Sequence, residues 1–482
     1  MNSNASRSPI DGEKSLSTLT QDQSVGATRR LASYLAGLRF EDLPPDVVQA
    51  SKVFVLDLLG TTLGARPTEE VRMASEVISA LGGHPECTVI GFPYRTSCAN
   101  AAFMNGLASH VMELDDTHRD SITHVGAPVI PAALAMAERE ARSGQTFLTA
   151  VVAGYEATLR IANAVQPSHW RRGFLSMGTC GTFGAAAAAG HCLGMDGDTL
   201  ANALGLAGIQ AAGLNSSIYG DGDMGKRLCP SHATSAGILS ALLAQKGFTG
   251  SMNVVEQRKG FCAAFADDYD LGRVTKNLGK TFEISRTSLK PYSCCRYNHA
   301  AIDGLLDIVS VESIKPDAIA SIRVRTYDIA VTNRPHRAHP KTLFDAKMSI
   351  PFCLAVAAHA RGAGERDFTE DLLGNPSVCG LAERVTVEAD EDMSRAFPQQ
   401  WPAHVQVILR DDRSFERLVP YPKGEPEAPM TESEIEDKFR DLATVTVTED
   451  AADAIIGAVH ALDRSAGVGA LLDTIARGLK TR

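Results

Sequence analysis

The chain has 482 residues, a length that favours two domains over one, and its hydrophobic fraction of 44% is typical of a globular protein. With 57 acidic residues against 47 Lys and Arg, the net charge of −10 argues against nucleic acid as the main partner. The ten cysteines show no disulfide spacing and no signal peptide is recognisable, so we expect free thiols in a reducing cytoplasm. The apolar runs are interrupted, so we expect no membrane span.

The N-terminal half of the chain predicts a large helical domain over residues 25–285. Residues 1–24 are polar and predict a disordered tail. Apolar residues then recur at helical spacing, and frequent Ala and Gly allow close packing. The expected helices are Thr28–Leu38, Pro45–Leu63, Glu70–Leu81, Thr96–Met112, Pro128–Ala137, Phe147–Val165, Cys180–Leu193, Thr199–Gly213 and His232–Lys246. The short segment Cys87–Gly91 is either a strand or a connector.

The hydrophobic pattern changes after about Ser285, where segments that alternate apolar and polar residues predict half-buried strands. The expected strands are Ala320–Tyr327, Val385–Glu388 and Val405–Leu409, with helices at Ala300–Val309 and Ser349–Ala360 between them. These elements predict a smaller α+β domain over residues 286–422.

A proline-rich linker, Pro420–Pro429, precedes a return to the helical pattern. Thr431 followed by Glu434 is a capping box and predicts a helix to Leu442. Further helices are expected at Ala451–Leu462 and Ala466–Gly478, so residues 430–482 should rejoin the first domain. The expected fold class is mainly α with an α+β part: a large discontinuous all-helical domain plus a smaller α+β domain.

Charged and polar side chains gather between two apolar, Ala-rich runs, Ala99–Met112 and Pro128–Ala137. They belong to the sequence ELDDTHRDSITH and are Glu113, Asp115, Asp116, Thr117, His118, Asp120 and His124. Charged groups seldom stay buried unless they are paired or bind something, so the stretch is a candidate site. The alternative is an exposed acidic loop between two helices.

A glycine-rich segment, Gly220–Lys226, approaches two nucleotide-binding patterns but fails on context. No strand precedes it, and Arg227 stands where a P-loop needs a hydroxyl group. A better interpretation is a loop that places Lys226 and Arg227 at a cavity, where cations suit a carboxylate substrate. The alternative is an exposed basic pair.

A second basic stretch, Lys290–His299, lies at the predicted domain junction and contains Lys290, Arg296 and Tyr297. Zinc bound by its two adjacent cysteines and its histidine is disfavoured, because most zinc sites separate the cysteines by two residues. Structural thiols beside a polar binding stretch are the preferred interpretation.

These stretches together resemble the MmgE/PrpD family, whose members include 2-methylcitrate dehydratases, cis-aconitate decarboxylases and iminodisuccinate epimerases. The resemblance runs from about Ala27 to Gly478. Its carriers, in chain order, are ELDDTH followed by His124, GYEATLRIA at Gly154–Ala162, GTCGTFGAAAAAG at Gly178–Gly190, GKRL at Gly225–Leu228, LLAQKGFTG at Leu242–Gly250 and LKPYSCCRYNHAAID at Leu289–Asp303.

The resemblance implies a helical domain built from both ends of the chain, a smaller α+β lid, a homodimer, and chemistry without a metal or organic cofactor in a cleft between the domains. By position it implies pocket residues at Glu113, Asp115, Asp116 and Thr117, an acid/base histidine at His124, and carboxylate-binding lysines at Lys226 and Lys290. Fixed cations stabilise the negative charge that forms when a proton is removed next to a carboxylate. A poised imidazole or carboxylate can move that proton.

Two departures from the family matter for the reaction. Many relatives have a histidine where this chain has Leu175, and many have another where it has Cys229. Leucine cannot carry a proton, so the departures argue against cis-aconitate decarboxylation and 2-methylcitrate dehydration in particular. The candidates to replace these imidazoles are His118, His169 and His232.

The leading hypothesis is a cofactor-free lyase, with a hydro-lyase preferred, that acts on a small di- or tricarboxylate of the 2-methylcitrate or aconitate type. His124 would be the main acid/base, aided by Asp115 or Asp116. Carboxylates would be held by Lys226, Arg227 and Lys290, with Glu113, Arg296 and Tyr297 as further substrate contacts. The alternatives are an isomerase or epimerase, a decarboxylase of the cis-aconitate type, and a non-catalytic member that binds carboxylates.

Overall fold

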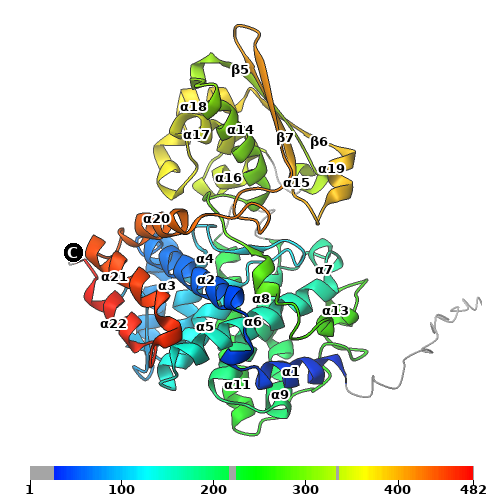
Figure 1. Ribbon diagram of the computed structural model, residues 1–482, viewed down its shortest axis with the longest axis vertical. Coiled ribbons are helices and arrows are strands. Elements are labelled where there is room, and N and C mark those ends of the chain that lie inside the picture. Colours follow the sequence, from blue (N-terminus) through cyan, green and yellow to red (C-terminus); the bar gives the residue numbers. More distant parts are fainter. Residues whose placement is uncertain (1–25, 217–223, 333–335, 481–482) are drawn as a thin grey trace, which may run out of the picture.

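The computed structural model describes residues 26–216, 224–332 and 336–480. A large helical body lies below a smaller body that combines helices with a sheet (Figure 1). The expected fold class, mainly α with an α+β part, is confirmed. The tail predicted for residues 1–24 lies outside the described residues.

All nine helices predicted for the first part of the helical domain are present, and the short helices α7, α12 and α13 are additional among the described residues. The helices observed there are α1 (Ala27–Gly37), α2 (Pro45–Gly64), α3 (Glu69–Leu81), α4 (Cys98–His110), α5 (Gly126–Arg139), α6 (Gly144–Val165), α7 (Ser168–Arg171), α8 (Ser176–Cys192), α9 (Gly197–Gln210), α11 (Leu228–Gln245), α12 (Phe261–Phe265) and α13 (Gly272–Thr275). The segment left open as strand or connector contains the short strand β1 (Cys87–Thr88), which pairs with β2 (Arg95–Thr96).

Small residues let the central helices approach closely. α8 packs against α5, α6 and α11, and almost all of its residues are buried. A Cβ atom at Gly184 of α8 would lie only 2.7 Å from the main-chain oxygen of Gly154 in α6. The Ala- and Gly-rich sequence is therefore what permits this packing.

The C-terminal helices return to the helical domain, as predicted. They are α20 (Glu432–Ala443), α21 (Glu449–His460) and α22 (Gly469–Arg477), and α20 packs along α2 (Figure 1). The Thr431 hydroxyl and the Glu434 carboxylate form the expected capping box at the start of α20. From α20, Lys438 donates a hydrogen bond of 3.0 Å to the carbonyl oxygen of Leu114 in the acidic stretch.

The upper body is a four-stranded sheet in the order β6-β5-β7-β8, with one parallel pair, β5 and β6. The strands are β5 (Ile319–Thr326), β6 (Val385–Ala389), β7 (Ala403–Leu409) and β8 (Ser414–Val419). The helices are α14 (His299–Val311), α15 (Asp328–Thr332), α16 (Leu343–Met348), α17 (Ile350–Ala360), α18 (Pro376–Ala382) and α19 (Glu391–Ala396). Three strands were predicted; β8 was not, because it is an edge strand without buried residues that alternate with exposed ones.

One short ladder ties the acidic stretch to the segment that enters the upper body. β3 (Thr117–His118) pairs antiparallel with β4 (Thr287–Ser288). Residues more than 150 positions apart in the sequence are thereby held side by side at the junction of the two bodies. The candidate site forms at this junction.

Among the described residues, α2 is long and apolar enough to cross a membrane by length and composition. However, 78% of its most apolar window is buried inside the protein, where it forms part of the helical core. A helix that is apolar on all sides is typical of such a position.

Candidate active site

The acidic stretch between α4 and α5 is buried. Glu113, Asp115, Asp116 and Thr117 are all less than a tenth exposed. The alternative of an exposed acidic loop is therefore wrong, and each of these carboxylates must find partners inside the protein.

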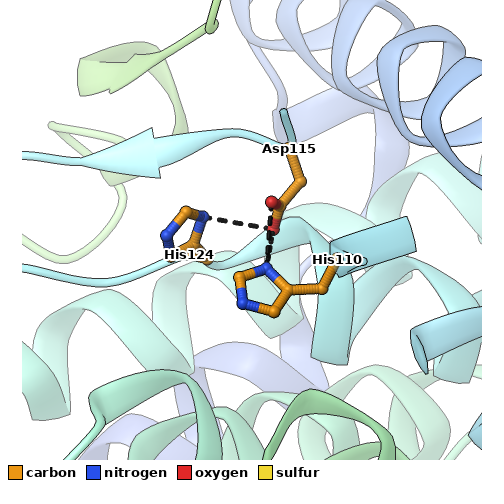
Figure 2. Close-up of side chains that lie close together, drawn as sticks. All are labelled: His110, Asp115 and His124. Atoms are coloured by element: carbon orange, nitrogen blue, oxygen red, sulfur yellow. Dashed lines mark hydrogen bonds and ion pairs between the residues drawn. The ribbon is translucent and has the colours of Figure 1, made fainter. Parts of the chain in front are cut away.

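Asp115 lies between two histidines (Figure 2). Its carboxylate oxygens each lie 3.0 Å from Nδ1 of His110, and Oδ2 lies 3.2 Å from Nδ1 of His124. Against the cost of burial, the contacts with His110 and His124 hold the pKa of Asp115 well below its usual range. Asp115 is thus an ionised carboxylate that orients both imidazoles.

His124 is suited to act as a base. Burial lowers the pKa of His124 to about 4, although the Asp115 carboxylate favours the charged imidazole. A neutral imidazole whose Nδ1–H faces a carboxylate presents an unprotonated Nε2 on its other side. The side chain is 16% exposed and lines a cavity, so a ligand can reach it.

Asp116 has a different environment from its neighbour. Its oxygens accept hydrogen bonds from the main-chain N–H of Gly126, at 2.8 Å, and from the hydroxyl of Tyr155, at 2.6 Å. Burial nevertheless raises the pKa of Asp116 to about 7, and the nearby Asp115 adds to the effect. Asp116 does not line the cavity, and its contacts fix the start of α5 beside the site.

Glu113 is held by two lysines from distant segments. Its carboxylate pairs with Lys226, and its main-chain oxygen accepts a hydrogen bond from Lys290. Against the cost of burial, the Lys226 ammonium holds the pKa of Glu113 well below its usual range. Glu113 also has a φ of 57°, in the left-handed region that non-glycine residues seldom adopt, so these two contacts maintain a strained backbone.

The two lysines therefore differ in position. Lys226 lines the cavity, whereas Lys290 is fully buried, does not line it, and approaches Glu113 from the main-chain side. Burial lowers the pKa of Lys290. Lys226, Lys290 and His124 lie in one region, as predicted. Lys290 contacts the main chain of Glu113 and can position that residue, but it does not line the cavity.

The cavity lies between the two bodies and has a volume of about 70 Å³. The acidic stretch and the helical domain supply Glu113, Thr117, His118, Ile122, Thr123, His124, Trp170, Leu175, Ser176, Met177 and Lys226, and the upper body supplies Cys295, Arg296, Tyr297 and Trp401. A cleft between the domains was the sequence-based expectation.

Two of the predicted substrate-binding cations, Arg296 and Arg227, already contact other protein groups. Arg296 lines the cavity, but its guanidinium pairs at 2.8 Å with Glu425, a carboxylate that is only 1% exposed. Arg227 does not line it; its guanidinium lies 4.6 Å from the ring centre of Phe344 and 3.9 Å from a carboxylate oxygen of Glu70.

Of the three histidines proposed as replacements, only His118 lines the cavity. Its Nδ1 lies 2.8 Å from the hydroxyl of Ser121, and its Nε2 lies 3.6 Å from Glu283. His169 is buried against Phe174 and bonded to Thr179, and His232 is exposed and contacts a main-chain oxygen.

Sequence reasoning missed His110 and the aromatic wall of the cavity. His110 stands in the last turn of an otherwise apolar helix, and a single imidazole in such a run was the available signal. Trp170 and Trp401 carried no motif, because they come from separate bodies and meet only in the fold.

One cluster in the site has the composition of a metal site. The side-chain ligand atoms of His110, Asp115 and His124 all lie within 4.8 Å of one another. Two imidazoles and one carboxylate suit several divalent ions, but the observed contacts also have the lengths of hydrogen bonds. Within the described ranges, Cys294, Cys295 and His299 do not form such a cluster.

Both domains of the chain match models of one protein family. A family model for the MmgE/PrpD N-terminal domain matches residues 29–273, and one for the MmgE/PrpD C-terminal domain matches residues 292–464. The chain is similar to a cis-aconitate decarboxylase-like protein, oryM, of Aspergillus oryzae, with 28% identity over 95% of this chain and 99% of the relative.

Two further relatives are cis-aconitate decarboxylases. The protein from Aspergillus terreus is 27% identical over 93% of this chain and 96% of its own length. The protein from Homo sapiens is 27% identical over 90% of this chain and 92% of its own length.

Proposed function

Because the chain belongs to the MmgE/PrpD family, whose two domain models together match most of it, we propose that it is a lyase acting on a small carboxylic acid of the aconitate type. The observation that carries the proposal is the arrangement of His124. Its imidazole is oriented by Asp115, is reachable through the cavity, and shares that cavity with the ammonium group of Lys226.

The proposed reaction is loss of water by proton abstraction. Nε2 of His124 takes a proton from the carbon next to a carboxylate, and the electron pair moves into that carboxylate, where Lys226 stabilises the charge. The pair then returns to form a carbon–carbon double bond as the bond to the β-hydroxyl breaks. The imidazolium returns its proton to the departing oxygen, so water leaves and His124 is neutral again.

Decarboxylation is the second candidate, because the relatives carry that activity in their names. Loss of carbon dioxide from an unsaturated acid requires that the enzyme deliver a proton to carbon. At neutral pH a histidine with a pKa of about 4 is unprotonated, which is the state that takes a proton and not the state that delivers one, and this favours proton abstraction and hence dehydration.

Incubation with citrate-like and succinate-like acids in deuterated water, followed by NMR, tests the proposal. Loss of water supports the hydro-lyase, and loss of carbon dioxide supports the second candidate. Deuterium exchange or inversion alone would indicate an isomerase or epimerase. Absence of any change would indicate a non-catalytic protein that binds carboxylates.

We also propose a homodimer that uses the exposed faces of α9 and α11. Ile209, Leu228 and Leu239 are between 47% and 79% exposed, and the two leucines are eleven residues apart on one face of α11. Exposed apolar clusters of this kind often mark protein contacts. Light scattering on the purified protein, with Leu239→Asp as the test variant, measures whether this face holds two copies together.

A further inference from the structure

The lining of the cavity between the two bodies combines two chemically different sets of residues. One set is His124, Lys226 and its partner Glu113, and the other has large apolar surfaces: Trp170, Leu175, Met177, Tyr297 and Trp401. These two sets are termed the charged side and the apolar side of the lining. A ligand that fills this space therefore contacts both kinds of surface.

Packing contacts hold the residues of the apolar side in place. Leu175 and Met177 form a small buried cluster, with Cys229 packed against it. From the upper body, the rings of Tyr297 and Trp401 pack edge to face with centres 5.0 Å apart. Because both domains contribute, the apolar side persists whenever the domains are in contact as they are here.

The charged side has little capacity left for additional carboxylates. Lys226 is already paired with the Glu113 carboxylate, so a substrate carboxylate must share that ammonium. Arg296 has five N–H groups, and four are engaged. Two of them face Glu425, one faces Nδ1 of His299 at 2.8 Å, and one faces the main-chain oxygen of Lys423 at 2.9 Å.

The polarity of the lining leads to the same conclusion. A carboxylate placed against the side chains of Leu175 and Met177 would lose part of its hydration and gain no hydrogen bond from them, which is unfavourable.

We propose that the substrate has no more than two carboxylates and carries an apolar alkyl or aryl substituent, which packs against Leu175, Met177 and Trp401, in the place where aconitate has a further carboxylate. This inference rests on the proposed function and narrows its substrate class. The carboxylate next to the reacting carbon lies toward Lys226, and the apolar substituent lies against the apolar residues of the lining.

Binding of two stable, matched acids tests the inference. Propane-1,2,3-tricarboxylate is a saturated analogue of aconitate, and 2-propylsuccinate has a propyl group in place of one carboxymethyl arm. Titration calorimetry on the full chain should show that 2-propylsuccinate binds at least about tenfold more tightly, because burial of an unpaired carboxylate is costly.

Variants of the apolar side should change this ratio. Leu175→His and Met177→Gln add polar groups and should reduce the preference for 2-propylsuccinate, whereas Leu175→Met keeps the apolar surface and should preserve it. Circular dichroism and thermal melting establish that each variant is folded. The two polar variants are independent, so failure of one to fold leaves the other as the test.

The outcomes separate the inference from the proposed function. Tighter binding of the tricarboxylate would overturn the inference while leaving a carboxylate-binding lyase in place. Equal binding of the two acids, or a ratio that neither polar variant changes, would also overturn it. If neither acid bound, and no acid exchanged protons in deuterated water, both the inference and the proposed function would be wrong.

Discussion

Oδ2 of Asp115 lies 3.2 Å from Nδ1 of His124, and this contact decides which nitrogen of the imidazole is available to a ligand. With Nδ1–H directed at the carboxylate, Nε2 is unprotonated and can accept a proton. The same carboxylate contacts His110, so its position is fixed from two directions.

We predict that His124→Ala and Asp115→Asn each lower kcat by about 10²–10⁴-fold, the range usual for loss of a positioned base. Asp115→Asn removes the charge that orients the imidazole. Turnover in deuterated water, followed by NMR, measures both. His339→Ala is the control, because that histidine is 63% exposed in the upper body and should retain full activity. Wild-type rates in both site variants would exclude His124 as the base.

The pH dependence of activity follows from the pKa of His124. A base is active when unprotonated, so kcat/KM should fall as the pH drops through about 4. An unperturbed histidine would instead give an inflection near about 6.5. Initial rates, taken with circular dichroism at each pH, distinguish acid unfolding from titration. An inflection near the unperturbed value would show that burial does not control this imidazole.

The buried carboxyl of Asp116 should make the protein less stable as pH rises. Its pKa of about 7 in the folded state exceeds the value of about 4 expected in the unfolded chain, so unfolding releases a proton between these values. The contribution is complete below the unfolded pKa and is lost as the pH rises through about 7, by up to about 1.4 kcal/mol per pH unit.

Asp116→Asn tests this dependence, because the amide does not titrate. The difference in unfolding free energy between wild type and variant, measured by urea denaturation from pH 4.5 to 7.5, should change steadily across that range. A difference that is constant with pH would mean that Asp116 keeps an ordinary pKa in the fold.

The ligand atoms of His110, Asp115 and His124 lie close enough together to bind a metal ion, so metal dependence of the activity can be tested. We predict that dialysis against a chelator leaves activity unchanged, because the Asp115 carboxylate already has a hydrogen bond of 3.0 Å with His110 and an ion-pair contact of 3.2 Å with His124. Elemental analysis before and after dialysis provides the metal content. Stoichiometric zinc or iron, whose removal abolishes turnover and whose return restores it, would establish a metal centre instead.

Helices with one buried face, such as α3 and α20, could be predicted from hydrophobic spacing, since burial of one face imposes a 3.6-residue period. The almost wholly buried α8 was marked instead by its long Ala- and Gly-rich run. The α20 start at Thr431 was marked by its own capping box. The strand Ser414–Val419 was not marked, because an edge strand with little burial needs no apolar period. The candidate residues around His124 were found because charge is unusual between buried runs.

The roles of the site residues depend on the three-dimensional fold. Lys226 and Lys290 are both lysines in basic stretches, yet one faces the cavity and the other the main chain of Glu113. Trp170 and Trp401 lie far apart in the sequence and have no local signal. Which side chains share a cavity depends on how the domains pack, which short patterns do not encode.

The buried pair of Lys226 and Glu113 should contribute to both stability and activity. Lys226→Met leaves an uncompensated carboxylate and should lower the unfolding free energy by about 3–5 kcal/mol. The double variant Lys226→Met, Glu113→Gln removes both charges and should recover much of that loss, yet remain inactive, because the substrate carboxylate has lost its cation. Urea denaturation and turnover measure the two effects separately.

Lys52→Met is the control, since Lys52 is also a buried lysine and forms an ion pair of 2.7 Å away from the site, with Asp463, whose side chain is 30% exposed. It should lose stability but keep kcat at its wild-type value. If the double variant at Lys226 and Glu113 recovered turnover together with stability, the pair would be structural alone. In that case the cation that binds the substrate would have to be Arg296. Its guanidinium also lines the cavity and has one N–H group left for a substrate carboxylate.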